Sequence, residues 1–306
     1  MANLEHTRGQ RLDRKVVELF PSLSRAFAAK LIEDERVSVN GVSQTKPGYR
    51  LRLEDVVTID YSPEKEASIP DVELEVLYED DDCVVINKPL GLLTHSKGAF
   101  NPEPTVATWL RRHCERIILS QEEHNVVNKD VRGLSFQKNE RGGIVHRLDR
   151  ATSGVMICAK NTEALSWLQK QFSQRRVKKK YIAVVSGTLE KEAAIIDMPI
   201  ERNPKKPATF RVGRGGKPSK TQYKVLICGD NRSLLELTPE TGRTHQLRVH
   251  LAHIGHPIVG DTFYGGAEAD RLYLHAESLE ITILAGHQRK VFSAATPKAF
   301  EESVDD

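Results

Sequence analysis

Several common sequence signatures are missing from this 306-residue chain. It has no run of about 18 apolar residues, which excludes a membrane-spanning helix. Its first residues, MANLEHTRGQ, lack an apolar core and include an acidic residue, so we expect neither a secretory nor an organellar signal. The 45 basic and 42 acidic residues leave a net charge of only +3, which excludes a histone-like polycation.

Cysteine is scarce as well, with four residues in the chain. None of them forms the C-x₂-C spacing that is typical of zinc sites, so cysteine-bound metal is not predicted. Each lies in or near an apolar run, which favours reduced core thiols in an intracellular, cytoplasmic protein. The four positions are Cys83, Cys114, Cys158 and Cys228.

The chain does contain enough apolar material for a sizeable core. Hydrophobic residues make up 39% of it and charged residues 28%, a balance typical of folded globular domains. Its 306 residues suggest about two domains of roughly 150 residues each. The segment YSPEKEASIP has two prolines and no periodicity, so we predict a linker over residues 61–70.

Residues 1–60 are predicted to form a small α/β domain. Two stretches with apolar residues at helical spacing come first, and Ser24 is placed to cap the second of them. Alternating valines then flank Asn40 and Gly41, the strongest short signal for a β-hairpin, because both turn positions require a positive φ. A last short strand ends the domain near residue 60.

Residues 71–306 are predicted to form a larger α+β domain. Short apolar strands are interleaved with helices, but few connections have the length of a helical crossover between parallel strands. We therefore predict a mixed, largely antiparallel sheet flanked by helices. A polar, aperiodic stretch of about residues 115–141 is interpreted as an insertion. The predicted strands include VMICA, YIAVVSG, TQYKVLI, SLLELT and LEITI.

The segment GGIVHRLDRATSG stands out in the larger domain. It places Asp149 between Arg147 and Arg150, and nearby positive charge favours the ionised form of a carboxyl group. An aspartate prepared in this way suits the role of nucleophile or base. The same pattern also fits a salt-bridged loop at the start of a strand, and the residues alone leave both interpretations open.

A second segment, TGRTHQLRVHLAHIGH, combines a predicted helix with ionisable side chains. Arg243 directly precedes the helix, with Thr244 as the expected N-cap. It is placed to supply the cation that a buried Asp149 requires, and the alternative is a solvated arginine. The segment also holds four histidines, but it has no H-E-x-x-H pattern and Asp261 is the nearest acid, so we predict helix packing or polar roles and no metal site.

In a third segment, KKKYIAVVSG, Tyr181 opens a strand directly after three lysines. This arrangement puts a phenol beside a basic patch. Ordinary packing is the alternative interpretation for Tyr181. The tyrosine becomes functionally interesting only if the fold brings it to Asp149.

Together these segments resemble the RluA-type pseudouridine synthase family. HRLDRATSG resembles its catalytic-aspartate motif, YIAVVSG its tyrosine motif and GRTHQLRVHLAHIGHPIVGD its arginine motif. Two further segments, VINKPLGLLTH and LYLHAESLEI, also fit the family. The order and the combination of these motifs carry the resemblance.

The first 60 residues independently resemble an S4 RNA-binding domain. Glu35 stands where that pattern usually has a small residue, often glycine, and this departure is expected to alter the start of the hairpin. The resemblance implies RNA contacts from both domains. The implied RNA-binding residues are Arg11, Arg14, Ser24, Arg25, Lys30, Asn40, Lys178 and Lys179.

The resemblance implies an enzyme that isomerises specific uridines to pseudouridine in structured RNA, without metal or organic cofactor. The target base has to be flipped out of its stack into a pocket. Asp149 is then the nucleophile, Arg147 fills the vacated stack or holds the flipped backbone, and Arg243 pairs with Asp149. The implied catalytic residues are Asp149, Tyr181 and Arg243, and the implied substrate-binding residues are His146, Arg147 and Leu274.

Two other classes of function stay open. A non-catalytic RNA-binding or ribosome-assembly factor would keep the scaffold, although the presence of Asp149, Tyr181 and Arg243 speaks against it. A hydrolase or phosphotransferase with an aspartate nucleophile would need Mg²⁺ held by further carboxylates, and no second acidic cluster accompanies Asp149. The S4 resemblance favours ribosomal RNA over transfer RNA as the substrate. No coiled-coil pattern occurs, so we expect a monomer.

The small net charge conceals an uneven distribution. Residues 61–82 hold nine acidic side chains and one lysine, whereas residues 171–224 hold fourteen basic and four acidic ones. The basic stripe at 171–224 suits contacts with phosphate groups, whose strength falls steeply with added salt. The distribution of charge therefore points to an RNA partner.

Overall fold

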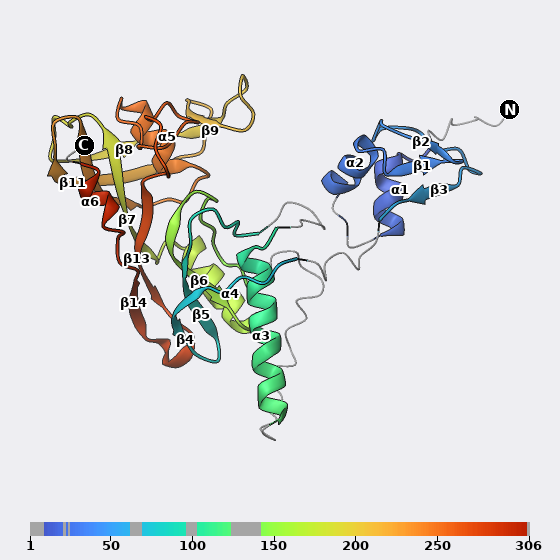
Figure 1. The fold of residues 1–306 in the computed structure, drawn as a ribbon, viewed down its shortest axis with the longest axis horizontal. Coiled ribbons are helices and arrows are strands. Elements are labelled where there is room, and N and C mark those ends of the chain that lie inside the picture. The colour runs from blue at the N-terminus through green and yellow to red at the C-terminus, as the bar shows by residue number, and fades with distance from the viewer. Residues whose placement is uncertain are drawn as a thin grey trace. The chain divides into compact units, whose positions relative to one another are not determined.

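The computed structural model describes residues 9–20, 23, 25–61, 69–95, 103–123 and 142–304. The chain divides into two compact units, one reaching to Val72 and the other holding most of the chain from Glu73 on, and each is described by itself (Figure 1). Most of the predicted linker 61–70 lies outside the described residues. In the part of the chain that is described, no helix combines the length and the apolar character needed to cross a membrane.

The N-terminal unit combines two helices with an antiparallel sheet of order β2-β1-β3. Asn40 and Gly41 join the first two strands with φ values of 53° and 79°, so the predicted hairpin turn is confirmed. Apolar side chains from both helices and from β1, among them Leu12 and Ile32, form the core. The elements are α1 (Leu12–Leu19), α2 (Arg25–Glu33), β1 (Val37–Val39), β2 (Val42–Ser43) and β3 (Val57–Ile59).

Glu35 has a consequence for the backbone of this unit. It follows α2 with a φ of 59°, in the left-handed region that glycine adopts most easily. The turn is closed by the amide of Arg36, which donates to the carbonyl of Leu31 at 2.9 Å. The predicted capping residue Ser24 lies outside the described residues.

The second unit is built on a nine-stranded sheet of order β4-β5-β6-β13-β7-β12-β11-β8, with β14 also paired to β13. Within the described residues one pair, β13 with β6, is parallel and the others are antiparallel. The predicted α+β class with a largely antiparallel sheet is therefore confirmed. The strands are β4 (Glu75–Glu79), β5 (Cys83–Lys88), β6 (Ser153–Ala159), β7 (Lys178–Ser186), β8 (Ala193–Asp197), β11 (Lys220–Cys228), β12 (Arg232–Pro239), β13 (Leu274–Thr282) and β14 (Arg289–Ser293).

Helices and one small hairpin complete this unit. Helix α4 packs on β6 and β13, where Trp167 donates its indole hydrogen to the carbonyl of Thr282 at 2.9 Å. Helix α5 contacts β10, which pairs with β9 in a hairpin outside the main sheet (Figure 1). The elements are α3 (Val106–Glu123), α4 (Thr162–Ser173), β9 (Ile200–Arg202), β10 (Phe210–Val212), α5 (Gln246–His253), a 3₁₀ turn (Ala285–His287) and α6 (Ala299–Glu302).

The structure differs from the sequence-based predictions at Cys228 and at the start of the predicted insertion. Cys228 is exposed, unlike the other three cysteines, because β8 pairs with β11 only as far as Lys224 and a register shift in β11 follows. Among the described strands, none pairs with the end of β11 on that side. The predicted insertion 115–141 begins as part of α3, which continues to Glu123, and residues 124–141 lie outside the described residues.

Candidate active site

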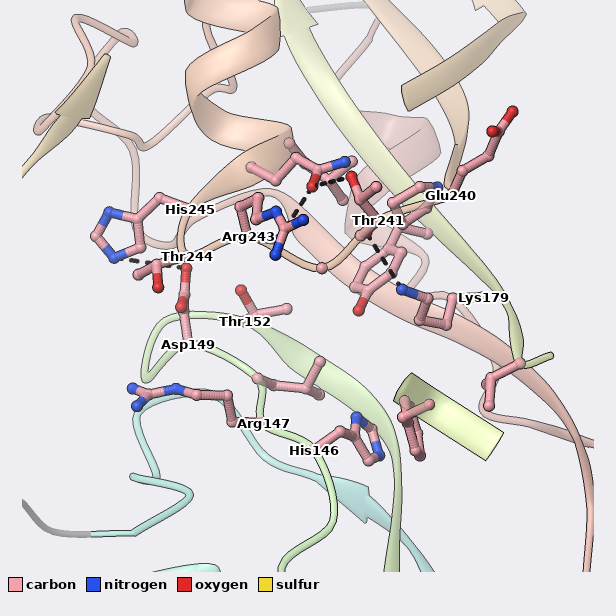
Figure 2. A pocket seen from close by; sticks show the side chains of 18 of the residues that line it. His146, Arg147, Asp149, Thr152, Lys179, Glu240, Thr241, Arg243, Thr244 and His245 are labelled. Atoms are coloured by element: carbon pink, nitrogen blue, oxygen red, sulfur yellow. Dashed lines mark hydrogen bonds and ion pairs between the residues drawn. The ribbon is translucent and has the colours of Figure 1, made fainter. Parts of the chain in front are cut away.

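A cavity of about 470 Å³ lies in the second unit, where the loop before β6, the strand β7, the loop between β12 and α5 and the first residue of β13 converge. The sequence-predicted residues from all three motifs line it. Figure 2 shows Asp149 and His245 on one side of this cavity and Lys179 on the other. The cavity is lined by His146, Arg147, Asp149, Lys179, Tyr181, Arg243, His245, Arg248 and Leu274, among others.

Asp149 enters the cavity from a tight turn. Its carbonyl accepts the amide hydrogen of Thr152 at 3.0 Å, so the chain reverses directly before β6. The side chain is 20% exposed, which leaves the carboxylate accessible from the cavity. Its Oδ2 lies 3.3 Å from Nη1 of Arg248 and 3.8 Å from Nε2 of His245.

The cation beside Asp149 is therefore Arg248 and not the predicted Arg243. Arg248 is 8% exposed and also forms two bonds of 2.7 Å with Asp261, which is 1% exposed. Burial alone would lower the pKa of Arg248, but hydrogen bonding and charge from Asp261 and Asp149 raise it above the ordinary value. The guanidinium stays charged and is fixed by a buried carboxylate on its far side.

Arg243 lies at a different place in the same cavity. Its Nε donates to the carbonyl of Pro218 at 3.2 Å, and within the described residues it forms no ion pair with Asp149. The expected N-cap Thr244 is also wrong, because α5 begins one residue later and its N-cap is His245, with a φ of 56°. The loop is instead closed by Gln246, whose Oε1 accepts the amide hydrogen of Arg243 at 3.0 Å.

Tyr181 and Leu274 line the same cavity as Asp149. Tyr181 lies on β7 and Leu274 begins β13, and the two strands are adjacent in the sheet. Burial, together with the charge of Asp149, raises the pKa of Tyr181 well above its ordinary value, so the phenol keeps its proton. The fold therefore brings Tyr181 to the cavity that holds Asp149, which is the condition under which the sequence made this tyrosine functionally interesting.

The three lysines before Tyr181 have different surroundings. Lys178 lies 3.4 Å from Glu280 and Lys180 lies 2.8 Å from Glu236. Lys179 instead points into the cavity, where its ammonium donates to the carbonyl of Thr241 at 3.4 Å (Figure 2). Burial lowers the pKa of Lys179 to about 8. The basic patch predicted at this point is thus partly neutralised, and its middle member belongs to the cavity wall.

His146 and Arg147 occupy opposite kinds of environment. His146 accepts the amide hydrogen of Ile157 at 3.1 Å and stacks on Phe172 at 4.6 Å, so it is packed into the wall. Burial, with a smaller contribution from the charge of Lys179, lowers the pKa of His146 to about 3. Arg147 is exposed at the mouth of the cavity.

Lys88 is a further group near the site that the sequence did not single out. It is fully buried, and its ammonium donates to the carbonyls of Pro89 at 2.9 Å and Leu92 at 2.8 Å. Burial lowers the pKa of Lys88 to about 8, although the charge of Asp149 opposes this shift. The signal was present in VINKPLG as a lysine inside an otherwise apolar strand.

The predicted RNA contacts of the N-terminal unit fall into two groups. Arg11 and Arg25 both bind the buried Asp13, at 2.9 Å each, and Asn40 bonds to Asp55 at 2.9 Å. These three side chains are thus paired with acidic side chains of the same unit. Arg14 and Lys30 are exposed, and Ser24 lies outside the described residues. Their RNA-binding roles stay predictions.

The histidines of α5 and its flanks do not converge. His250 is buried between Thr221 and the carbonyl of Met198, at 2.9 Å from each, whereas His253 is exposed. Across the described ranges no three histidine, cysteine or acidic side chains gather as metal ligands would. Helix packing is therefore the role of His250.

Comparison with known proteins shows which family this site belongs to. Residues 82–253 match the family described as RNA pseudouridylate synthase, and residues 10–57 match the S4 domain. The chain belongs to the RNA pseudouridylate synthase family and carries an S4 domain at its N-terminus, as the motifs predicted. It is an isomerase that converts uridine to pseudouridine in RNA.

Individual relatives agree with this membership. The ribosomal large subunit pseudouridine synthase D of Yersinia pestis is 38% identical over 288 residues, which cover 94% of this chain and 82% of the relative. The protein of the same name from Escherichia coli K12 is 39% identical over 264 residues, 86% of this chain and 74% of the relative. The solved structure of human RNA Pseudouridylate Synthase Domain Containing 1 superposes with a TM-score of 0.54 at 29% identity, covering 77% of this chain and 89% of that chain.

Proposed function

We propose that this enzyme isomerises uridine in large-subunit ribosomal RNA and that Asp149 is its nucleophile. The observation that carries the assignment of Asp149 is its carboxylate in an accessible cavity, 3.3 Å from the buried cation Arg248. Arg248 stabilises the negative charge of the carboxylate without covering it. Tyr181 and Leu274 supply the apolar walls that a flat base requires.

The reaction requires the target base to leave its helix. Flipping the nucleotide into the cavity costs a few kcal/mol in lost stacking and pairing, which contacts with the protein have to offset. The exposed Arg147 at the cavity mouth is placed to fill the vacated stack or to hold the flipped backbone. Tyr181 is placed to stack on the uracil ring.

A carboxylate in this position has three routes to the product. It attacks C1′ of the ribose, removes the C2′ proton to give a glycal, or adds to C6 of uracil. In each route the bond from N1 to C1′ breaks, the uracil rotates inside the cavity and C5 joins C1′. The C5 proton is then lost and N1 gains a proton. Asp149 leaves C1′ or C6 where it had formed an adduct, and in the glycal route it returns the proton to C2′. Lys179, opposite Asp149, is placed to donate a hydrogen bond to a uracil carbonyl oxygen while the base is detached (Figure 2).

Three features support ribosomal RNA as the substrate. The relatives from Yersinia pestis and Escherichia coli are named as large-subunit enzymes, the chain has an S4 domain, and the second unit has a basic stripe. Acting on ribosomal RNA would place the enzyme in the cytoplasm, where it is proposed to work as a monomer. Transfer RNA is the competing substrate.

The assignment of Asp149 has a direct test. Asp149→Asn is expected to abolish tritium release from RNA that carries C5-tritiated uridine, while RNA binding stays largely intact. Asp230→Asn, at an exposed position outside the cavity, is the matched control and should keep wild-type turnover. Substantial turnover by Asp149→Asn would overturn the proposal.

The substrate is tested separately by mapping pseudouridine in cells with and without the gene. Loss of pseudouridine at discrete sites in large-subunit ribosomal RNA is the expected result. Loss confined to transfer RNA would contradict the ribosomal assignment and leave Asp149 as the nucleophile.

A further inference from the structure

A backbone amide and two side chains link β10 to Asp149. The amide of Phe210 donates to the hydroxyl oxygen of Tyr264 at 3.0 Å. That hydroxyl lies 2.7 Å from Nδ1 of His245, whose Nε2 lies 3.8 Å from Oδ2 of Asp149. The series joins β10, the loop after α5, the N-cap of α5 and the turn before β6.

The positions of the protons in this series follow from what surrounds them. If Nδ1 of His245 carried the proton, the lone pair of Nε2 would face the carboxylate of Asp149, which is electrostatically unfavourable. If Tyr264 donates to Nδ1, both groups are satisfied and Nε2–H faces Asp149. Burial raises the pKa of Tyr264, so the phenol has a proton to donate.

His245 also stays uncharged at neutral pH. Burial lowers the pKa of His245, although the charge of Asp149 opposes this shift. Among the described residues, Arg248 is then the fully charged cation in contact with Asp149. His245 adds a hydrogen-bond donor beside the carboxylate without adding a second positive charge. A carboxylate balanced by one cation keeps more of its nucleophilic character than one balanced by two.

Tyr264 contacts both of these partners of Asp149. The guanidinium carbon of Arg248 lies 5.1 Å from the centre of the Tyr264 ring, within cation–π distance. His245 meets the same ring edge-on at 5.7 Å. His245 itself has a left-handed backbone, with a φ of 56°, and such strain in a residue other than glycine clusters at functional sites.

From this geometry we infer that His245 is a positioning residue, held by Tyr264 so that its Nε2–H orients the carboxylate of Asp149. The 3.8 Å separation is longer than a hydrogen bond, and catalytic hydrogen bonds are often long before they tighten in the substrate complex. The inference rests on the proposed role of Asp149. It adds a function for the histidine of the arginine motif.

Two substitutions of His245 distinguish the effect of losing the Nε2–H donor from the effect of changing the backbone preference at this position. The amide nitrogen of Gln reaches the place of Nε2, whereas the shorter Asn reaches only Nδ1 and fits a left-handed backbone better. We expect His245→Asn to lower kcat by about 10- to 100-fold, by analogy with outer-shell groups that orient metal ligands, and His245→Gln to recover most of this loss. His253→Gln, at an exposed position on α5, is the control.

The role of Tyr264 is read from the tautomer of His245. In ¹⁵N spectra, with the His245 signals identified by their absence in His245→Gln, we expect Nε2 to be protonated and Nδ1 to be bare. Tyr264→Phe should remove this preference and lower kcat with little change in KM. Tyr264→Phe is also expected to leave the other histidine signals in place, which shows that it folds.

The possible outcomes are distinct. A proton on Nδ1 in the wild type, or kcat losses in His245→Gln as large as in His245→Asn, would overturn the inference. Full activity of both His245 variants would do the same. If the wild-type chain forms no pseudouridine, the proposed function fails, and the ¹⁵N spectra still decide whether Tyr264 fixes the tautomer.

Discussion

Arg248 contacts two carboxylates at once, Asp149 at the cavity and the buried Asp261. It is 3.3 Å from Asp149 and forms two 2.7 Å bonds with Asp261, which is almost completely buried. In the proposed reaction Asp149 takes part in the chemistry, whereas Asp261 holds the guanidinium in place. Removing Arg248 therefore affects activity and stability together.

We predict that Arg248→Met lowers turnover by at least about 100-fold, comparable to the loss of one preorganised donor. It should also lower the free energy of unfolding by about 3–5 kcal/mol, because Asp261 is left as an unpaired buried charge. Arg243→Met is the comparison. It should change the free energy of unfolding by less than about 0.5 kcal/mol and act mainly on KM. Urea unfolding and tritium release measure the two effects, and the reverse ranking would contradict the assignment of Arg248.

Lys179 provides a prediction about pH. Burial lowers its pKa from 10.5 to about 8, so the folded state binds its proton less tightly than the unfolded state does. Below pH 8 the buried, charged amine of Lys179 therefore lowers the free energy of unfolding. As the pH rises from 8 to 10.5 the amine loses its proton in the folded state, and the free energy of unfolding increases. We expect Lys179→Met to be more stable than the wild type at pH 7, to lose this advantage toward pH 10.5, and to turn over more slowly.

Lys180→Met serves as the control for that experiment. Lys180 pairs with Glu236 at 2.8 Å, and this hydrogen bond raises its pKa. Removing Lys180 should give no gain in stability at any pH, and thermal unfolding across the pH range compares the two variants. A Lys179→Met chain that is less stable than the wild type at neutral pH would show that Lys179 is not under this penalty.

At the scale of elements, the turn between α2 and β1 is under backbone strain because Glu35 stands there instead of a glycine. Glu35 adopts a φ of 59°, which costs a residue with a side chain about 1 kcal/mol or more. Glu35→Gly removes the steric cost but adds unfolded-state entropy, so we expect a net stabilisation of roughly 0.5–1 kcal/mol. This stabilisation is measured as slower hydrogen exchange of the β1 amides in the full chain.

The neighbouring position supplies the comparison. Asp34 does not have a positive φ. Asp34→Gly therefore adds conformational entropy to the unfolded state without removing any steric strain from the folded state. It should speed exchange of the same amides, whereas Glu35→Gly slows it. Equal effects of the two substitutions would mean that the left-handed turn is not strained.

For the whole molecule, the distribution of charge matters more than the total of +3. Lys178 and Lys180 are paired with glutamates, while Lys205 and Lys206 are exposed between β9 and β10 and form no ion pair within the described residues. Phosphate contacts should therefore come more from the second pair of lysines than from the first. Each lysine that contacts a phosphate contributes roughly 0.7–0.9 to the salt dependence of binding.

We predict that Lys205→Gln and Lys206→Gln each weaken RNA binding and lower the slope of log affinity against log salt by about one. Lys178→Gln and Lys180→Gln should change the slope much less, because their charges are already balanced. Filter binding over a range of salt concentrations measures these slopes. Larger effects at Lys178 and Lys180 would show that their ion pairs open when RNA binds.

Local patterns predict much of this molecule because they report on local physics. Alternating valines around Asn40 and Gly41 indicate a hairpin whatever surrounds them, and apolar runs without crossovers indicate antiparallel strands. The ends of elements are less predictable. Cys228 lies in an apolar run, yet it is exposed because β8 is too short to cover the end of β11.

By itself the sequence determined the family, the S4 domain and the candidate nucleophile Asp149, because the motifs lie in short segments whose residues can be read in order. Only the tertiary structure decided which cation meets Asp149, since Arg243 and Arg248 lie five positions apart in one segment and the start of α5 turns only the second toward the carboxylate. It also decided that Lys179 faces the cavity, because alternation along β7 separates it from its two neighbours. Contacts between residues about a hundred positions apart depend on how strands and helices pack, and no local pattern records that packing.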